Sequence, residues 1–492
     1  MATETEIKFS LSARTASQLA KHPLLAGVEP HRQLLVNTYY DTPDGRLRRE
    51  RVVVRYRRKG REWLLTVKTA ALLSGGLAQR SEWEVPGRPG EFDFWNVDDL
   101  VVRGLLESVR DQLQPIFTTR FTRQAWLLEP RSGLRVELAL DRGLIEAQAR
   151  RRTIREIELE LLAGAVGDLF LLAGELQATL PLHPEARSKS DRAYRLLADA
   201  PAAAAKALPA PVAGAMPSIG AFRVITLCCL NHLQNNEEGV CDSDLPEFVH
   251  QARVAMRRLR SAMRLWEPLL PESFVAHFDP LWQGLAAKLG DARNWDVFIA
   301  ETLPALRTAF PDAAETDRLA LYSQRRCAGS RQAARRALRS ADYSRLLIEF
   351  TAAVLGLPEA DTGPLAAFVP RCLNKRLRRV IERAPDALGA DVAARHRLRV
   401  AFKQLRYALE FFTPIVVAPG LPGYLQATTS LQELLGRLND LAVARQMTLA
   451  ALPGRKGEAL QAWLGAAIES LRPELARQLS DFQQRVAPWE EP

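Results

Sequence analysis

Acidic and basic side chains alternate with apolar ones in several short segments near the start of the chain. Glu4, Glu6 and Lys8 occupy every second position of the first such segment, and residues 156–160 repeat the pattern with three glutamates. Because the side chains of a β-strand point alternately to its two faces, each set of charges shares one face. Carboxylates grouped in this way bind hard divalent cations, such as Mg²⁺ or Mn²⁺, through oxygen.

Basic residues follow the same period of two in other segments. Arg55 and Arg57 share one strand face, Lys68 follows in the next segment, and Arg80 precedes two glutamates at the same spacing. A polar face turned to bulk water explains any one of these segments by itself. A closed barrel would instead place both signs of charge on one interior wall, where an unpaired charge is costly. Clustered Arg and Lys side chains bind phosphate, so the combined set predicts a site for a divalent metal and a polyphosphate.

The same alternation predicts the elements that would position these residues. We expect a helix at residues 165–179 and strands at 5–10, 35–40, 52–58, 63–68, 80–85, 117–128, 133–141 and 153–162. Eight strands with few helices are typical of an antiparallel barrel or sandwich.

Further motifs follow one another through the first 200 residues. They are Tyr39-Tyr40-Asp41-Thr42, Arg55-Tyr56-Arg57, Thr66-Val67-Lys68, Arg80-x-Glu82-x-Glu84, Glu137 with Asp141-Arg142-Gly143, Glu156-x-Glu158-x-Glu160 and Ser188-Lys189-Ser190-Asp191-Arg192. With Glu4-x-Glu6-x-Lys8 at the start, this ordered series resembles the CYTH domains, the triphosphate tunnel metalloenzymes. The resemblance implies an eight-stranded antiparallel tunnel, in agreement with the strand count.

The resemblance also implies roles for individual residues in the hydrolysis of inorganic triphosphate. It implies that one or two divalent ions, Mg²⁺ or Mn²⁺, and a water molecule are held by Glu4, Glu6, Glu156 and Glu158. It implies that the triphosphate is held by Lys8, Arg55, Arg57, Lys68, Arg120 and Lys189, with Arg80 and Arg123 assisting. The expected catalytic set is Glu4, Glu6, Lys8, Glu156 and Glu158.

Other acidic residues are candidates of second rank. They are Glu82, Glu84, Glu137, Asp141 and Glu160. Asp41 precedes a Pro-Asp-Gly turn signal, so capping of a turn competes with contact to the ligand at this position.

Residues 201–217 form an Ala/Pro-rich stretch between residues 1–200 and residues 218–488. Such composition without periodicity is typical of a semi-rigid linker. The pattern after it is helical almost throughout and repeats at an offset of 146 residues, which aligns His250 with His396. We therefore expect a multidomain fold: an α+β tunnel or barrel with flanking helices, then an all-α domain of two similar four-helix bundles.

Basic residues in each copy of the repeat are spaced by three and four, which places them along one face of a helix. They are His250, Arg253, Arg257, Arg260 and Arg264 in the first copy, His396, Arg399, Lys403 and Arg406 in the second, and Lys375 and Arg379 between the two. A solvated face, or one paired with acids of a neighbouring helix, explains a single stripe. Because like charges at this spacing repel, their repetition favours an anionic ligand. The duplicated pattern resembles the CHAD domain, which implies binding of inorganic polyphosphate.

The overall composition bounds the partners and the location. The 492 residues include 67 Lys and Arg against 57 Asp and Glu, a formal net charge of +10, which favours an anionic partner. We find no motif for specific nucleic-acid binding, no apolar run of membrane-spanning length and no secretory signal pattern. Five cysteines without a C-x-x-C pair are expected to be reduced. We therefore expect a cytoplasmic protein, associated with polyphosphate granules.

Three functions remain open at this point. The combined resemblance is to bacterial CYTH–CHAD inorganic triphosphatases, with polyphosphate bound by the helical domain. A tunnel enzyme acting on an organic triphosphate, such as an adenylate cyclase or a thiamine triphosphatase, would need a surface for a base or ring. A non-catalytic polyphosphate-binding scaffold would gain nothing from grouped carboxylates without metal.

Overall fold

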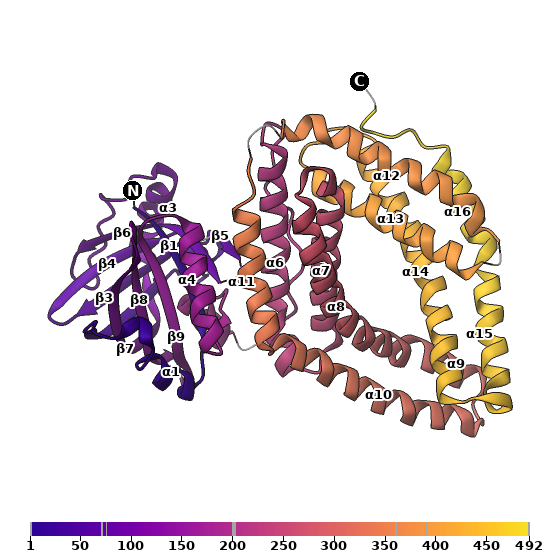
Figure 1. Ribbon diagram of the computed structural model, residues 1–492, viewed down its shortest axis with the longest axis horizontal. Coiled ribbons are helices and arrows are strands. Elements are labelled where there is room, and N and C mark those ends of the chain that lie inside the picture. The colour runs from indigo at the N-terminus through magenta and orange to yellow at the C-terminus, as the bar shows by residue number, and fades with distance from the viewer. Residues whose placement is uncertain are drawn as a thin grey trace. The chain divides into compact units, whose positions relative to one another are not determined.

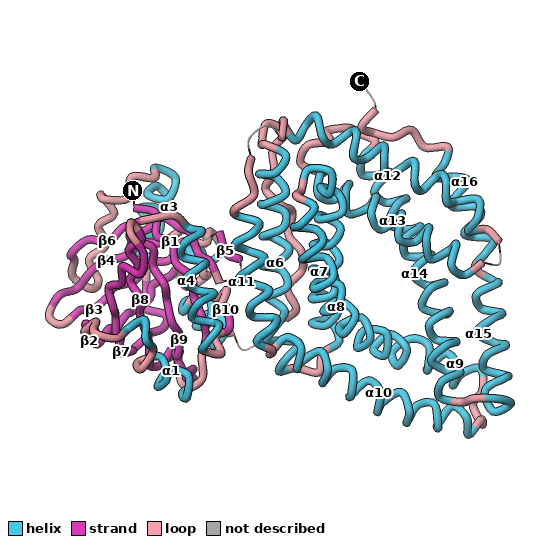
Figure 2. Tube along the Cα trace, in the orientation of Figure 1, coloured by secondary structure: helices cyan, strands magenta, loops and turns pink. Residues whose placement is uncertain are grey.

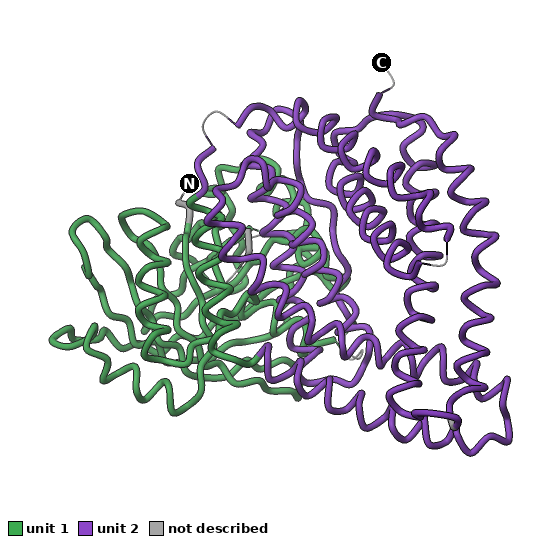
Figure 3. The backbone as a smooth tube through the Cα atoms, turned by 45° about the vertical axis from the view of Figure 1, so that its right-hand side comes forward, with its two compact units in different colours: residues 1–203, 339–356 green, residues 204–338, 357–492 purple. Residues whose placement is uncertain are grey.

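The computed structural model describes residues 2–69, 72–74, 76–198, 203–359, 362–389 and 391–490. The chain forms two compact units (Figure 3). The first unit holds residues 1–203 and 339–356, and the second holds residues 204–338 and 357–492. The chain thus leaves the first unit once and re-enters it for a single helix.

A closed antiparallel β-barrel forms most of the first unit (Figures 1 and 2). Its strands are β1 (Ala2–Ser10), β2 (His31–Asp41), β3 (Val53–Lys59), β4 (Glu62–Lys68), β6 (Leu77–Pro86), β7 (Gln114–Arg131), β8 (Leu134–Ala147) and β9 (Arg150–Ala163). They pair in the order β1-β9-β8-β7-β2-β3-β4-β6, and β6 pairs again with β1. Two short strands extend the sheet: β5 (Leu72–Ser74) pairs with β6, and β10 (His183–Pro184) pairs with β1. The predicted eight-stranded barrel is confirmed.

The outer surface of the barrel carries the apolar residues of the strands. Helices α1 (Ala13–Leu19) and α4 (Val166–Thr179) belong to one core with Phe9, Leu140 and Leu159. Helices α2 (Arg46–Arg49) and α3 (Leu100–Val109) belong to a second core with Tyr56 and Val67. Because neighbouring residues of a strand point to opposite faces, packing these side chains outward turns the alternate, charged residues inward.

Helix α5 (Lys189–Leu197) packs against β8 and β9. Its Ala193 belongs to an apolar cluster with the inward residues Leu35, Phe121 and Ile154. The helix begins with a capping box, in which the Ser188 side chain accepts from a backbone N–H and an aspartate side chain returns the bond. The capping box fixes the start of the helix, so that Lys189 is its first residue.

The second unit is helical, as predicted, and is built from two copies of one pattern (Figure 1). The first copy contains α6 (Ser218–Asp242), α7 (Pro246–Trp266), α8 (Glu272–Val297), α9 (Leu303–Ala309) and α10 (Ala314–Leu338). The second contains α12 (Leu365–Ala387), α13 (Val392–Phe412), α14 (Leu421–Ala451), α15 (Glu458–Ser470) and α16 (Arg472–Gln483). The bounds of α7 and α13 differ by the predicted offset of 146 residues. Within the described residues, each copy thus contains five helices rather than the predicted four. The additional helix is the short α9 in the first copy, and in the second copy a break before Pro473 separates α15 from α16.

The Ala/Pro-rich stretch stays a prediction as a linker, because residues 201 and 202 lie outside the described residues. Its described part carries neither helix nor strand before Ser218. Ala205 exchanges hydrogen bonds with Asn236 of α6, at 2.9 and 3.0 Å, and also accepts one from His232. In the described part of the chain, no helix is both long and apolar enough to cross a membrane.

Gly143 provides a test of the barrel's close packing. A Cβ at this position would lie 2.1 Å from the carbonyl oxygen of Arg120 and 2.4 Å from Cα of Phe121. Because both atoms belong to the backbone of β7, Gly143→Ala should lower the free energy of unfolding by about 1–3 kcal/mol, measured by chemical denaturation. Gly104→Ala is the control: it lies in α3 with open space around it and should be neutral or stabilising. Equal stability of the two variants would contradict the prediction.

Candidate functional site

The inner wall of the barrel brings together the predicted carboxylates and most of the predicted cations. Pairing of β1 with β6 places Glu4 opposite Arg80. Pairing of β1 with β9 places Lys8 opposite Glu158. Residues more than 140 positions apart in the sequence therefore meet across one ladder, and their side chains form three clusters.

The first cluster surrounds Glu4 and Glu6 on β1. Both carboxylate oxygens of Glu4 accept hydrogen bonds from Lys68 Nζ, at 3.0 and 2.9 Å. Arg80 joins the two glutamates, because its Nε donates to Glu4 at 2.6 Å and a terminal nitrogen donates to Glu6 at 2.5 Å. Lys8 Nζ lies 2.8 Å from a Glu6 oxygen. Two acids and three cations thus compensate one another.

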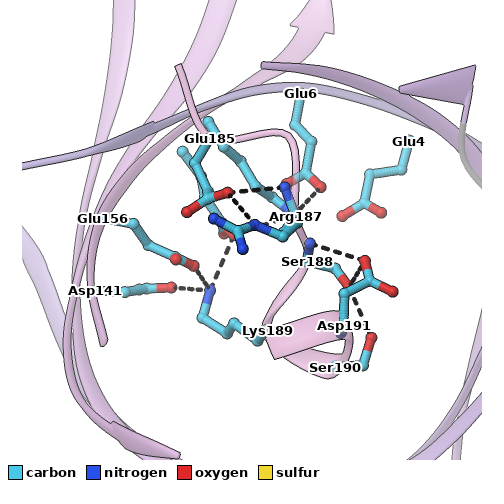
Figure 4. A network of polar contacts seen from close by, with 12 residues as sticks. Glu4, Glu6, Asp141, Glu156, Glu185, Arg187, Ser188, Lys189, Ser190 and Asp191 are labelled. Carbon is cyan, nitrogen blue, oxygen red and sulfur yellow. Dashed lines mark hydrogen bonds and ion pairs between the residues drawn. The ribbon is translucent and has the colours of Figure 1, made fainter. Parts of the chain in front are cut away.

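The second cluster gathers Asp141, Glu156 and Glu158 around Lys189. Figure 4 shows the Lys189 ammonium between Asp141 and Glu156. One carboxylate oxygen of each acid lies within 4.8 Å of the others. Lys189 Nζ lies 2.7 Å from Asp141 and 3.0 Å from Glu158, and forms an ion pair with Glu156. Arg123 donates to both oxygens of Asp141, at 2.8 and 2.7 Å, and also contacts Glu158.

The third cluster consists of Arg55 and Arg57 on β3, which polar residues of β2 hold in place. Arg57 Nε donates to Asn37 Oδ1 at 3.1 Å. The buried Asn37 amide in turn donates to the Thr119 hydroxyl at 2.9 Å. Tyr39 lies opposite Arg55 in the ladder. Glutamates of β6 lie 3.5 and 3.7 Å from the two guanidinium groups.

Burial and the neighbouring charges together set the protonation of the wall. Burial opposes the ionisation of Glu158, but Lys189, Arg123 and Lys8 hold its pKa well below the usual range. Burial also opposes the charge on Lys189, whose pKa the surrounding carboxylates raise. Glu160 differs, because burial and the nearby glutamates raise its pKa to about 7. Glu158 and Lys189 are therefore both charged near neutral pH.

Arg120 lies outside this wall, contrary to its predicted role. It is paired in register with Val36 and Leu144, and its side chain is exposed. Arg123, three positions further on β7, points to the opposite face because side chains alternate along a strand. We therefore correct the predicted triphosphate-binding set by removing Arg120, whose odd spacing from Arg123 already separates the two faces.

Asp41 caps the short helix α2. Its Oδ1 accepts from the backbone N–H groups of Thr42 and Leu47, each at 2.8 Å. Its Oδ2 accepts from the Tyr194 hydroxyl at 2.8 Å. Of the two roles considered from the sequence, capping is the one observed.

Two residues of the wall were given no role from the sequence: Arg192, which belongs to the last motif of the ordered series, and Asn37. Arg192 is buried and forms an ion pair with Glu156. It follows Lys189 by three residues on α5, a spacing that places both on one helix face. Asn37 orients Arg57. In the sequence, its spacing of two from Tyr39 was the one feature that could have placed it on the same strand face.

The donor set of the second cluster fits a hard divalent cation. Three buried carboxylates supply the oxygen ligands that Mg²⁺ and Mn²⁺ prefer. Among the described residues, Glu156 Oε1 makes no hydrogen bond, although a lysine ammonium contacts it. The predicted metal ligands divide between two clusters, Glu4 with Glu6 and Glu156 with Glu158, and Asp141 joins the second pair.

In the second unit, α7 and α13 bring the two predicted basic stripes together. The pKa of Arg253 is lowered to about 10 by burial and by Arg257 and Arg399. Burial, with these arginines and Arg264, lowers the pKa of Lys403 to about 7. Arg257 Nε is buried and makes no hydrogen bond within the described part of the chain. These five residues, 253, 257, 264, 399 and 403, are called the basic cluster below.

Corresponding residues at the far end of each stripe are compensated within the protein. Arg260 donates to Asp279 at 2.9 Å. Its counterpart Arg406 donates to Gln432 at 2.6 Å and lies 2.9 Å from Glu410. Arg264, at the end of the first stripe, lies 3.9 Å from the same Asp279 and so borders both the paired end of the stripe and the basic cluster.

The remaining predicted residues of this surface have other surroundings. His396 Nδ1 lies 3.2 Å from the side-chain oxygen of Asn439. Burial, and then nearby arginines, lower the pKa of His250. Lys375 and Arg379 lie on α12, where Lys375 is exposed and Arg379 is half-buried.

The basic cluster predicts an unusual pH dependence of stability. A lysine in the unfolded chain titrates near ~10.4, whereas Lys403 in the folded chain titrates at about 7. Between these values the unfolded chain binds more protons, so the free energy of unfolding should rise with pH there and level off below. Lys403→Met should abolish this rise, so the melting-temperature gain over wild type should be largest at about pH 6 and vanish towards about pH 10. A difference in melting temperature between the two proteins that stays the same at every pH would contradict the prediction.

Comparison with known families divides the chain between residues 194 and 225, close to the end of the barrel segment at residue 203. The model of the CYTH domain matches residues 2–194, and the model of the CHAD domain matches residues 225–449. An inorganic triphosphatase of Haemophilus influenzae is 33% identical over 200 residues, which cover 40% of this chain and 55% of that protein. The chain thus matches little more than half the length of this relative.

Solved structures are similar to each part. The CHAD domain of the plant Ricinus communis is 33% identical, covers 59% of this chain and 99% of its own, and superposes with a TM-score of 0.51. A Hippeastrum protein described as a putative adenylyl cyclase with dominant triphosphatase activity is 21% identical, with 39% and 95% covered and a TM-score of 0.31. The two family matches identify residues 2–194 as a CYTH domain and residues 225–449 as a CHAD domain.

Proposed function

We propose that the barrel hydrolyses inorganic triphosphate with the help of a divalent metal. The observation that carries this proposal is the inner wall, where buried carboxylates and buried cations occupy neighbouring strands. A phosphate chain alone needs only cations, and a metal alone needs only carboxylates. The naming of a 33% identical relative as an inorganic triphosphatase supports the substrate class.

When the substrate binds, its phosphate oxygens would take over from the carboxylates as partners of the cations on the wall. Lys8, Lys68 and Lys189 now neutralise acids on the same wall and would turn to the phosphate oxygens. Arg55 and Arg57 would hold the chain from β3, because guanidinium groups bind phosphate in a fixed, forked geometry. The freed carboxylates would then hold the metal, so substrate and metal each compensate what the other releases.

Glu4, Glu6, Glu156 and Glu158 are the proposed metal ligands, and Asp141 is added to them. A divalent ion bound there would neutralise phosphate oxygens and lower the pKa of a water molecule for attack on phosphorus. Arg80 and Arg123 lie between the acids and would hold them in position. We propose Mg²⁺ or Mn²⁺, since both prefer oxygen ligands.

An inorganic substrate fits the wall better than a nucleotide or thiamine triphosphate. Tyr39 of β2 and Phe117 of β7 stack on each other with ring centroids 4.6 Å apart, and Tyr194 packs edge-on against Phe117 at 5.2 Å. Tyr39 and Phe117 are each only 4% exposed, so neither presents a free ring face on which a base could stack.

We propose that the CHAD domain binds inorganic polyphosphate at the basic cluster. Two helices from the two copies of the repeat bring its five cations together, and burial weakens their hydration. A chain of closely spaced negative charges would relieve the mutual repulsion along both helices at once. Polyphosphate has this geometry and needs no sequence-specific contacts.

Phosphate release from tripolyphosphate, ATP and thiamine triphosphate, each with Mg²⁺, Mn²⁺ or EDTA, tests the enzymatic proposal. Metal-dependent release chiefly from tripolyphosphate, lost in Glu4→Gln, would support it. Release chiefly from ATP or thiamine triphosphate would show that the substrate is an organic triphosphate rather than inorganic triphosphate. Absence of release from all three, with polyphosphate binding retained, would favour the scaffold.

Arg123 and Arg120 form a matched pair for testing the site's geometry. They lie on one strand and face opposite sides of it. Arg123→Met should lower kcat/KM for tripolyphosphate by about 100-fold, because charge stabilisation on the wall is lost. Arg120→Met should leave it within about twofold, as expected for exposed surface residues. Steady-state kinetics on folded variants, checked by circular dichroism, decide; equal losses would refute the assignment of faces.

The basic cluster can be tested by binding alone. Arg257→Met combined with Arg399→Met should weaken binding of long-chain polyphosphate and reduce the slope of log affinity against log salt by about two. The matched control is Arg397→Met on α13, an exposed arginine paired with Asp391. Fluorescence anisotropy over a salt series gives both quantities. If Arg397→Met changes the slope as much, binding is spread over the surface rather than centred on the cluster.

A further inference from the structure

Helix α11 (Ala341–Leu355) is set apart from its sequence neighbours. It lies within the residues that match the CHAD domain, yet it belongs to the barrel unit (Figure 3).

The contacts of α11 in the barrel unit involve one short region of the CYTH domain. Its Ile348 is 2% exposed and belongs to the same apolar core as α4 and the barrel's outer face. The Ser344 hydroxyl lies 2.8 Å from His183 Nδ1. The Gln177 amide donates both to the Ser344 carbonyl and to the Leu182 carbonyl, each at 3.2 Å. These bonds join α11 to the segment 180–184.

The segment held in this way leads directly into the active site. Strand β10 has only two residues, paired with Phe9 and Ser10 of β1. The next residue, Glu185, donates its backbone N–H to the carbonyl of Lys8 at 2.9 Å. Four residues later the chain delivers Lys189 to the three carboxylates (Figure 4). A two-residue strand supplies few ladder bonds, so the packing of α11 carries much of the positional restraint.

We propose that α11 is a positioning element for Lys189, supplied to the CYTH domain by the CHAD sequence. By holding residues 180–184 against β1, it determines where the Lys189 ammonium meets Asp141, Glu156 and Glu158. This inference rests on the proposed function and adds that residues 1–200 do not complete the site by themselves. Displacement of a binding group by about 1 Å can lower a rate by about 100-fold, so a distant helix can matter to catalysis.

The test uses the full chain with Ser344→Ala and Ile348→Ala combined. Hydrogen exchange of the backbone amides at 180–190 should become about tenfold faster, while the barrel strands keep their protection. With tripolyphosphate, kcat/KM should fall about tenfold. Glu349→Ala, an exposed change on the same helix, should alter neither quantity. Leu128→Ala, a cavity in the same apolar core on β7, should lower stability without selective exchange at 180–190.

A double-mutant cycle shows whether α11 acts through Lys189. Lys189→Met alone should reduce kcat/KM, and adding the two α11 changes should cause little further loss, because the positioned group is gone. Additive losses would overturn the proposal, as would unchanged exchange at 180–190 or a rise equal to that in Leu128→Ala. If the wild-type chain releases no phosphate, the proposed function fails, and the exchange measurement still decides whether α11 holds the segment.

Discussion

Mutual compensation of buried charges is the constraint on which the barrel depends. Isolated ions inside a protein carry a desolvation penalty of several kcal/mol or more, so each must find a partner of opposite sign. The barrel meets this requirement across strands: Lys68 and Arg80 hold Glu4, and Lys189 holds Asp141 with two glutamates. A sheet that turns its apolar faces outward needs helices to cover them, which is why α1 to α4 surround the barrel.

The same compensation makes the wall suitable for binding two ligands of opposite charge. In each ion pair, one protein group occupies a position that a ligand of the same charge could take. A phosphate chain can replace the acids as partner of the lysines, and a metal can replace the lysines as partner of the acids. Arrival of only one ligand would leave charges of the other sign unpaired, so the two are expected to favour each other's binding.

The helical domain solves a different electrostatic problem. Arg260 and Arg406 are paired with acids or amides, whereas the basic cluster places Arg253, Arg257 and Lys403 beside other cations. Burial, and then the neighbouring arginines, lower the pKa of Arg253 to about 10 and that of Lys403 to about 7. In the proposed function, an anion would relieve the repulsion in the helical domain, whereas the ligands of the barrel would replace partners in ion pairs that its wall already makes.

The local pattern of the sequence was sufficient for the eight barrel strands and for the strand faces that carry the charged residues. Alternation of charged and apolar residues has a period of two, which identifies strands and assigns Glu4, Glu6 and Lys8 to one face. Spacings of three and four identify helix faces, and the offset of 146 residues identifies the duplication. These features depend on backbone geometry within one element, so they can be read along the chain.

Partners across elements were decided only by the tertiary structure. Register brings Asp141 beside Glu156, and the packing of the barrel decides that Arg123 rather than Arg120 faces inward; neither result follows from motif order alone. Asn37, Arg192 and helix α11 act through contacts with residues 20 to about 160 positions away. Long-range contacts depend on how complete elements pack, because the free energy of burial belongs to the assembled surface rather than to any segment. The sequence thus determined which chemistry each face can offer, and the fold determined which faces meet.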